Sequence, residues 1–165
     1  MSAEIAKLVR TAISQTRALA RGLSPVVLDS NGLMSALKEL AENTEKLFQI
    51  SCRFQCDQPV LLQDNAAATH LYRIAQEAVN NAIKHGQAKH VTIQLMIARP
   101  RILLLIQDDG TGRPKIPAKH QGMGLRIMQY RAGMVGGTLA VQRDPDGGTR
   151  VTCSFQSRNR QPPDP

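Results

Sequence analysis

The spacing between apolar residues changes abruptly near the middle of the chain, and this change constrains the fold more than any other feature. Residues 66–85 carry an apolar residue every three or four positions, which predicts a helix that Gly86 ends. Residues 91–97 alternate between apolar and polar, which predicts a half-buried strand. The continuous apolar run 102–106 predicts a strand buried on both faces. Only a short turn separates these two strands, so we expect them to pair antiparallel.

The remaining elements are predicted in the same way. Apolar residues at helical spacing predict three further helices, over residues 2–22, 32–48 and 123–134. Runs with strand patterning predict three further strands, over residues 51–57, 139–141 and 151–155. This order predicts an α+β fold, a two-layer α/β sandwich in which helices cover one face of a mixed, mostly antiparallel sheet.

The charge balance indicates an anionic ligand rather than a nucleic acid. The formal net charge is +8, but basic residues are scattered and aromatic residues make up only 3% of the chain, so the aromatic platforms that stack on single-stranded bases are missing. The odd number of cysteines, without a secretory signal, predicts a reduced, cytoplasmic compartment. We expect Cys52, Phe54 and Cys56 to share one buried face of a strand. No apolar run reaches the roughly 20 residues of a membrane span.

Four polar residues of the helix over 66–85 are spaced so that they share one face. Glu77, Asn81, Lys84 and His85 are expected opposite the apolar stripe of that helix. An amide oxygen suits Mg²⁺, which takes oxygen ligands beside substrate phosphates, and a lysine can hold a phosphate as a point charge. By itself, this pattern also fits an ordinary solvent-facing helix surface.

Two glycine-bearing segments follow. In the first, Asp108 comes directly after the buried strand, where a carboxylate needs a donor to offset desolvation, and Gly110 and Gly112 let the backbone approach a ligand closely. In the second, residues 122–125 open a helix, whose N-terminus is a ready site for an anion. Each segment alone also fits an Asp-Gly turn or a glycine-rich loop.

Taken together in this order, the three segments resemble the motifs of the GHKL superfamily of ATPases. Residues 77–85 resemble its N box, Asp108-x-Gly110-x-Gly112 its first glycine box, and Gly122-x-Gly124-Leu125 its second. Gly148-Thr149 is similar to the Gly-Thr pair before the last strand. Residues 73–85, 124–132 and 23–37 are further similar to the nitrate-sensor and DesK-like histidine kinases. The resemblance covers about residues 32–156 and implies the Bergerat fold.

The resemblance also implies roles for single residues around ATP and Mg²⁺. It implies that Asp108 accepts a hydrogen bond from the adenine amino group, that Asn81 contacts Mg²⁺, and that Glu77 acts with it through water. It further implies a catalytic role for Glu77 and Asn81. The remaining cofactor-binding residues are expected around the adenine, under the lid between the glycine boxes, or beside the phosphates: Lys84, His85, Gly110, Gly112, Gly122, Met123, Gly124, Leu125 and Thr149.

The resemblance divides the chain into three parts. Residues 1–25 are expected to be the second helix of a truncated dimerisation and phosphoacceptor domain, residues 26–156 the ATP-binding catalytic domain, and residues 157–165 a disordered tail. The implied partners are ATP, a histidine-bearing dimerisation domain, a response regulator receiver domain and a second copy of the parent kinase, which can be membrane-anchored. Because no acceptor histidine segment is present, we expect this chain to bind ATP without phosphorylating itself.

Three alternatives compete with this interpretation. An anti-sigma-factor serine kinase or a gyrase-like ATPase carries similar boxes, but the short loop 113–121 and the Leu-Ser-Pro segment at 23–25 favour the histidine kinases. A degenerate module could bind a nucleotide or a partner without kinase activity, although Asn81, Asp108 and the four box glycines are intact. Nucleic-acid binding rests on the net charge alone, and its signature would be a strong salt dependence.

Overall fold

The computed structural model describes residues 2–23, 32–60, 62, 64–111 and 122–156. Within them a five-stranded sheet has the order β1-β2-β3-β5-β4. The strands are β1 (Ser51–Gln55), β2 (His90–Ala98), β3 (Arg101–Asp108), β4 (Thr138–Arg143) and β5 (Thr149–Gln156). Only β1 and β2 pair in parallel, and the other three pairings are antiparallel. The predicted mixed, mostly antiparallel sheet is therefore confirmed.

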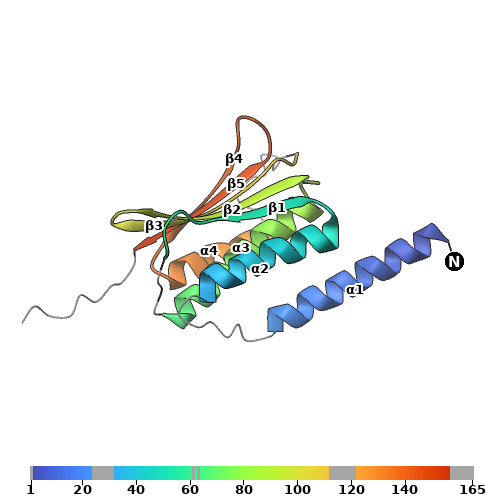
Figure 1. Cartoon of the computed structure of the whole chain (residues 1–165), viewed down its shortest axis with the longest axis horizontal. Coiled ribbons are helices and arrows are strands. Elements are labelled where there is room, and N and C mark those ends of the chain that lie inside the picture. The colour runs from blue at the N-terminus through green and yellow to red at the C-terminus, as the bar shows by residue number, and fades with distance from the viewer. Residues whose placement is uncertain (1, 24–31, 61, 63, 112–121, 157–165) are drawn as a thin grey trace, which may run out of the picture.

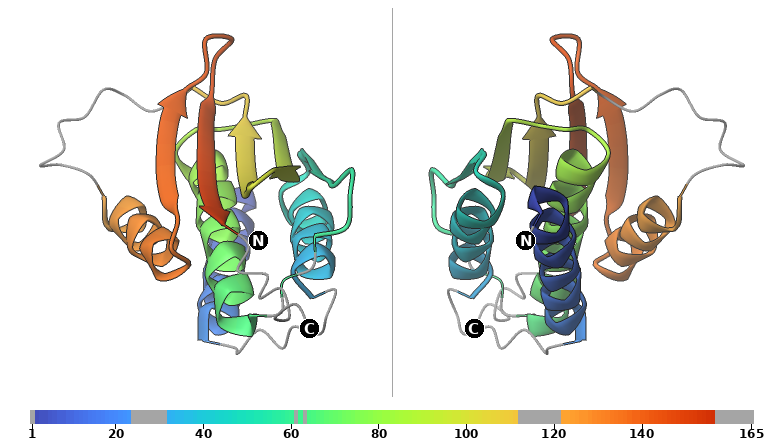
Figure 2. Two further views of the ribbon diagram at one scale, coloured as in Figure 1. Left: turned by 90° about the vertical axis from the view of Figure 1, so that its left-hand side faces the viewer. Right: turned by 90° about the vertical axis from the view of Figure 1, so that its right-hand side faces the viewer.

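Three helices form a second layer on one face of the sheet. They are α2 (Gly32–Phe48), α3 (Asn65–Lys84) and α4 (Met123–Met134), and α3 lies in the middle of the layer (Figure 2). The predicted two-layer sandwich is thus confirmed, and the bounds of α2 and α4 coincide with the ranges that the apolar spacing predicts. Figure 1 shows the sheet above this layer.

The core lies between the two layers, and α3 contributes most to it among the helices. Its apolar residues recur at helical spacing and are buried: Ala68, Leu71, Ile74, Ala75, Ala78, Val79 and Ala82. The inward residues of β2 and β3, such as Ile93 and Leu104, are fully buried beneath them. Each fully buried Ile or Leu side chain contributes about 1.5–3 kcal/mol, so this contact fixes α3 over the centre of the sheet.

The prediction that residues 102–106 are buried on both faces is wrong. Ile102, Leu104 and Ile106 are buried, but Leu103 and Leu105 between them are only half-buried. The reason is that α2, α3 and α4 all lie on one face of the sheet, so only the inward side of β3 meets a helix layer (Figure 1). The strand over 51–57 also ends earlier than predicted, at Gln55, so Cys52 is buried in β1 while Cys56 lies beyond it and is half-buried.

The first helix, α1 (Ala3–Leu23), contacts none of the other helices or strands in the described part of the chain (Figure 1). Four apolar side chains at helical spacing are therefore exposed on it: Ile5, Leu8, Val9 and Ile13. None of the described helices is both long enough and apolar enough to span a membrane. The junction at 24–31, the predicted lid including Gly112 and His120, and the predicted tail at 157–165 lie outside the described residues.

Candidate functional site

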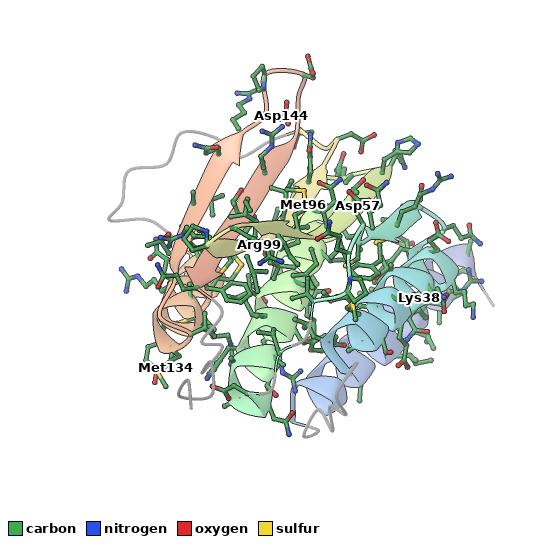
Figure 3. The ribbon with its side chains drawn as sticks, turned by 60° about the vertical axis from the view of Figure 1, so that its left-hand side comes forward. Lys38, Asp57, Met96, Arg99, Met134 and Asp144 are labelled. Carbon is green, nitrogen blue, oxygen red and sulfur yellow. The ribbon has the colours of Figure 1, made fainter. Side chains whose placement is uncertain are left out.

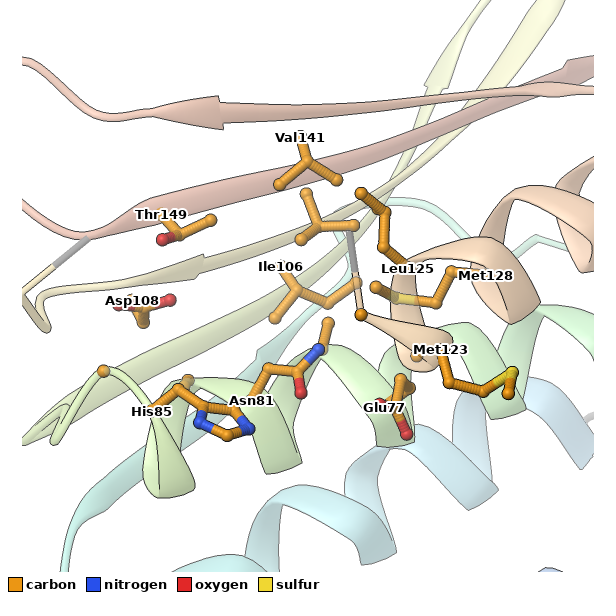
Figure 4. A pocket seen from close by; sticks show the side chains of 16 residues that line it. Glu77, Asn81, His85, Ile106, Asp108, Met123, Leu125, Met128, Val141 and Thr149 are labelled. Atoms are coloured by element: carbon orange, nitrogen blue, oxygen red, sulfur yellow. The ribbon is translucent and has the colours of Figure 1, made fainter. Parts of the chain in front are cut away.

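A cavity of about 560 Å³ opens between α3, α4 and the neighbouring ends of β3, β4 and β5 (Figure 4). This volume lies within the range typical of sites for small molecules and cofactors. Its lining brings together nine of the residues that the sequence singles out: Glu77, Asn81, His85, Asp108, Gly122, Met123, Gly124, Leu125 and Thr149. Segments far apart in the chain therefore meet around one cavity.

The α3 wall of the cavity carries Glu77, Asn81 and His85, spaced one helical turn apart (Figure 4). The expectation that this face lies opposite the apolar stripe is wrong, because Ala78 and Ala82 of that stripe line the same cavity. Successive residues of a helix are only about 100° apart, so the polar and apolar faces adjoin. Lys84 is exposed at the end of α3 and does not belong to the lining, so its role at the phosphates stays a prediction.

Asp108 is the one carboxylate on the sheet side of the cavity among the described lining residues. It ends β3 at an inward position and is only 9% exposed. Its Oδ1 accepts a hydrogen bond of 2.8 Å from the backbone N–H of Gly110. Burial raises the pKa of this carboxyl above its ordinary value, although the backbone N–H groups of Gly110 and Thr149 partly oppose the rise. The site therefore holds a desolvated acceptor that lacks a cationic partner among the described side chains.

The β4–β5 hairpin holds Thr149 beside Asp108. Gly148, the residue before it, has a φ of +85°, and a Cβ there would overlap the carbonyl oxygen of Asp108. Only glycine adopts this conformation without strain and leaves room for the neighbouring strand. The Gly-Thr pair singled out in the sequence thus allows the hairpin to approach the end of β3, which places the Thr149 side chain at the cavity (Figure 4).

The N-terminus of α4 forms the opposite wall. Gly122 is the N-cap residue, and no side chain within the described residues caps this helix. The first N–H groups of an uncapped helix remain free to bind an anion. Gly124, in the first turn of the helix, lies directly against the carboxylate of Glu77. The arrangement thus combines a helix N-terminus with a carboxylate and an amide from α3.

Sequence patterns did not single out the apolar walls of the cavity. Ile106, Met128 and Val141 face it together with Leu125 (Figure 4), and Val151 also lines it. Each occupies an inward position of a strand or helix, so its pattern predicts only a core residue. These residues meet at one cavity because β3, β5 and β4 are neighbours in the sheet. The strand order cannot be read from the local sequence pattern, so the pattern does not identify these walls. Gly110 lies beside the lining rather than in it, where it donates to Asp108.

The donors present fit a hard cation with few protein ligands. The amide oxygen of Asn81 and the carboxylate of Glu77 lie on neighbouring turns of α3. The described residues contain no group of three or more His, Cys, Asp or Glu side chains that could enclose a metal ion. Mg²⁺ typically takes one or two protein oxygens and completes its shell with water and substrate phosphates, so these two side chains suit it.

Comparison with known proteins agrees with the sequence motifs. The sequence pattern of the family described as "Histidine kinase-, DNA gyrase B-, and HSP90-like ATPase" matches residues 66–159. The nitrate/nitrite sensor protein NarQ of Escherichia coli K12 is 35% identical over 80% of this chain and 24% of its own length. The sensor protein VraS of Staphylococcus saprophyticus is 31% identical over 88% of this chain and 41% of its own. The chain thus spans less than half of these relatives.

Solved structures share the fold. The ATP binding domain of PrrB from Mycobacterium tuberculosis superposes with a TM-score of 0.62 at 21% identity, covering 77% of this chain and 95% of that domain. The histidine kinase domain of the Erythrobacter litoralis EL346 blue-light activated histidine kinase gives a TM-score of 0.64 at 18% identity. The match covers 86% of this chain and 69% of that domain. At these identities the likeness establishes the architecture, and the sequence relatives carry the family assignment.

Proposed function

The chain belongs to the family of histidine kinase-, DNA gyrase B- and HSP90-like ATPases, and on this premise we propose that it catalyses phosphoryl transfer from ATP to a histidine in a two-component sensor kinase. Its relatives include a nitrate/nitrite sensor protein and the sensor protein VraS, which supports an ATP-binding kinase module. The phosphate would then pass to an aspartate on a response regulator receiver domain.

The observation that carries the proposal is the buried acceptor Asp108 at the inner end of an apolar cavity. An adenine ring is flat and largely apolar, so Ile106, Met128 and Val151 suit its faces and edges. Its amino group is a hydrogen-bond donor, which needs an acceptor-only partner. The carboxylate of Asp108, which already accepts from the N–H of Gly110, has further acceptor lone pairs for that amino group. We assign Thr149 to the same adenine end.

The opposite end of the cavity suits the triphosphate. The N-terminus of α4 at Gly122–Leu125 offers backbone N–H groups to phosphate oxygens there. His85 lies nearer the Asp108 side of the cavity (Figure 4), and we assign it and the neighbouring Lys84 to the phosphates from the end of α3. When bound, Mg²⁺ would neutralise charge on the phosphates, with Asn81 as a ligand and Glu77 acting through water. Positioning and charge neutralisation supply most of the catalysis of phosphoryl transfer, and we assign these side chains to that task.

The acceptor histidine is assigned to a dimerisation domain, of which residues 1–25 are the second helix. The exposed stripe on α1 supports this assignment, because an amphipathic helix without a partner in its own domain is suited to pack against a helix of another. We assign residues 26–156 to the catalytic domain. In the transfer, the bond from the γ-phosphorus to its bridging oxygen breaks as a bond to the histidine nitrogen forms, and ADP leaves.

The proposal is tested by calorimetric titration with a non-hydrolysable ATP analogue and Mg²⁺. We expect saturable binding to the wild-type chain and a Kd raised roughly ten- to a hundredfold in Asp108→Asn. A separately supplied dimerisation domain from a nitrate-sensor kinase, incubated with this chain and labelled ATP, would then report transfer. A folded wild-type chain that binds no nucleotide would overturn the proposal in favour of a degenerate, partner-binding module.

A further inference from the structure

We propose that Asp109 is a positioning residue for nucleotide binding, because its carboxylate fastens the start of β2 to the end of β3 and so holds Asp108 in register with α3. The inference deepens the proposed function and rests on it. Asp109 itself is exposed and does not line the cavity, so it acts through its neighbours.

The contacts of Asp109 all reach one short segment. Its Oδ1 accepts hydrogen bonds of 2.8 Å from the backbone N–H groups of both Lys89 and His90. Its Oδ2 lies 2.6 Å from Nδ1 of the His90 ring. Its own backbone N–H donates to the carbonyl of His90 at 3.2 Å. Both carboxylate oxygens and the main chain of Asp109 therefore hold the first residues of β2.

The same segment is joined to the end of α3. The N–H of Thr111 donates to the carbonyl of Gly86 at 2.8 Å, and the N–H of Ala88 donates to the carbonyl of Ala82 at 3.0 Å. Ala82 and Gly86 both line the cavity. The connection from α3 to β2 is thus fixed on one side to α3 and on the other to the chain that follows Asp108. We call the contacts of the Asp109 carboxylate with Lys89 and His90 the Asp109 clamp. The clamp joins the start of β2 to the end of β3, so α3, β2 and β3 are all connected at this point.

The clamp contributes to geometry more than to stability. The side chains of His90 and Asp109 are 72% and 46% exposed, and side-chain contacts this exposed to water typically contribute little to stability. Asp108, by contrast, must meet a ligand whose other end is held by α3 and α4, and a small misplacement between two such groups costs affinity. Loss of the clamp is therefore expected to weaken nucleotide binding while leaving the chain folded.

Three variants separate positioning from charge. Asp109→Ala removes every side-chain contact of the clamp. Asp109→Asn keeps an oxygen for the two backbone N–H groups. Asp57→Ala is the matched control, since it removes the same charge from an exposed residue beyond β1, at the opposite edge of the sheet from β4 (Figure 3).

The affinity for a non-hydrolysable ATP analogue with Mg²⁺ is the first readout. We expect Asp109→Ala to raise the Kd about tenfold, equivalent to about 1.4 kcal/mol, and Asp109→Asn to restore most of the loss. Asp57→Ala should match the wild type. Melting curves should show every variant folded at the titration temperature. An Asp109→Ala protein that binds as the wild type does would overturn the inference, as would an Asp109→Asn protein as weak as Asp109→Ala.

A second readout does not need the nucleotide. Hydrogen exchange in the ligand-free chain reports on the N–H of Gly110, which donates to Asp108. We expect this N–H to exchange faster in Asp109→Ala than in the wild type, and at the wild-type rate in Asp57→Ala. If the wild type bound no nucleotide, the proposed function would fail, and unchanged Gly110 exchange would separately overturn the positioning role.

Discussion

The carboxylate of Glu77 on α3 lies directly against Gly124 on α4, so that a Cβ at position 124 would overlap a carboxylate oxygen. The segments that resemble the N box and the second glycine box thus meet at this contact. This contact keeps the first turn of α4, which no described side chain caps, next to the carboxylate of Glu77. Any side chain at position 124 must displace either Glu77 or α4.

Gly124→Ala is therefore expected to weaken binding of the ATP analogue about tenfold or more, because the added methyl group displaces Glu77 or the α4 N-terminus. Gly133→Ala is the matched control, since a Cβ at Gly133 of the same helix meets nothing within 4 Å. We expect it to leave the Kd unchanged. Adding Gly124→Ala to a Glu77→Ala protein should cost less affinity than adding it to the wild type, and equal losses in the two backgrounds would show that the contact with Glu77 is not the cause.

The ionised carboxylate of Asp108 is expected to lower the stability of the folded chain while it strengthens binding of the nucleotide. Burial raises its pKa, so its ionisation in the folded state costs free energy as pH rises through that raised pKa. Asp108→Asn removes this cost, and its melting temperature at pH 7 should equal or exceed that of the wild type. The affinity for the ATP analogue should instead increase as pH rises through this pKa, because only the ionised carboxylate is an acceptor on both oxygens.

Titrating the wild type with the ATP analogue at decreasing pH tests the predicted pH dependence of the affinity. Binding should weaken at a higher pH than expected for an ordinary aspartate, whose pKa is about 3.9. At neutral pH, the loss of a hydrogen bond to a charged group in Asp108→Asn corresponds to about 1.5–3 kcal/mol, or roughly ten- to a hundredfold in Kd. A variant that melts well below the wild type would contradict this account.

The elements of the fold followed from the sequence wherever the apolar pattern was strong and a breaker ended it. The helices over 32–48 and 123–134 are found with the predicted bounds. The first has a regular apolar stripe, and the second lies between glycine-bearing segments that do not continue it. The one-sided burial of β3 could not be predicted from the run 102–106, because a half-covered strand and a fully covered strand can carry the same apolar residues.

The candidate site was predictable only in part for a similar reason. Glu77, Asn81 and His85 share a face by helical spacing alone, and the structure brings them together. The apolar walls at Val141 and Val151 depend on which strands are neighbours, which local patterns do not encode. The contacts of Asp109 with Lys89 and His90 likewise depend on the register of β2 with β3, so the sequence shows only an Asp-Gly turn.

The N-cap of α3 provides a test of how the helix at the cavity is anchored. The apolar spacing predicts this helix from residue 66 and does not identify its N-cap. In the structure the side chain of Asp64 caps the helix and accepts hydrogen bonds from the N–H groups of Ala66 and Ala67. Asp64→Ala should lower the free energy of unfolding by about 1 kcal/mol. Asp64→Asn keeps the acceptor oxygen and should lose less. Urea denaturation measures both, and equal losses would show that the charge rather than the cap matters.

The three thiols should differ in reactivity. Burial raises the pKa of Cys52 and of Cys153 to about 11, so neither forms much of the reactive thiolate at pH 8. Cys56 is only half-buried, although burial raises its pKa as well. A thiol reagent should therefore modify one cysteine per folded chain quickly and the other two only on unfolding. In Cys56→Ser the fast phase should vanish, and a fast phase that persists would contradict the burial of Cys52 and Cys153.

A pH-sensitive contact joins α3 to α4 below the cavity. The guanidinium Nη1 of Arg131 lies 3.2 Å from Nδ1 of His70, which can accept a hydrogen bond only when the ring is neutral. Burial, and then the nearby charge of Arg131, lower the pKa of His70 below its ordinary value. The unfolded chain therefore binds a proton at this position more readily than the folded chain does.

It follows that the stability conferred by neutral His70 is present above about pH 6.5, the ordinary pKa of histidine, and is lost as pH falls through the lowered pKa. We expect the melting temperature of the wild type to fall between pH 7.5 and pH 5.5 by more than that of His70→Gln. Arg131→Gln removes the charge of Arg131 but not the burial of His70. The fall of its melting temperature with pH should therefore lie between that of the wild type and that of His70→Gln. If His70→Gln followed the wild type across this range, the decline would have to come from other groups, and the contact between His70 and Arg131 would not couple the two helices to pH.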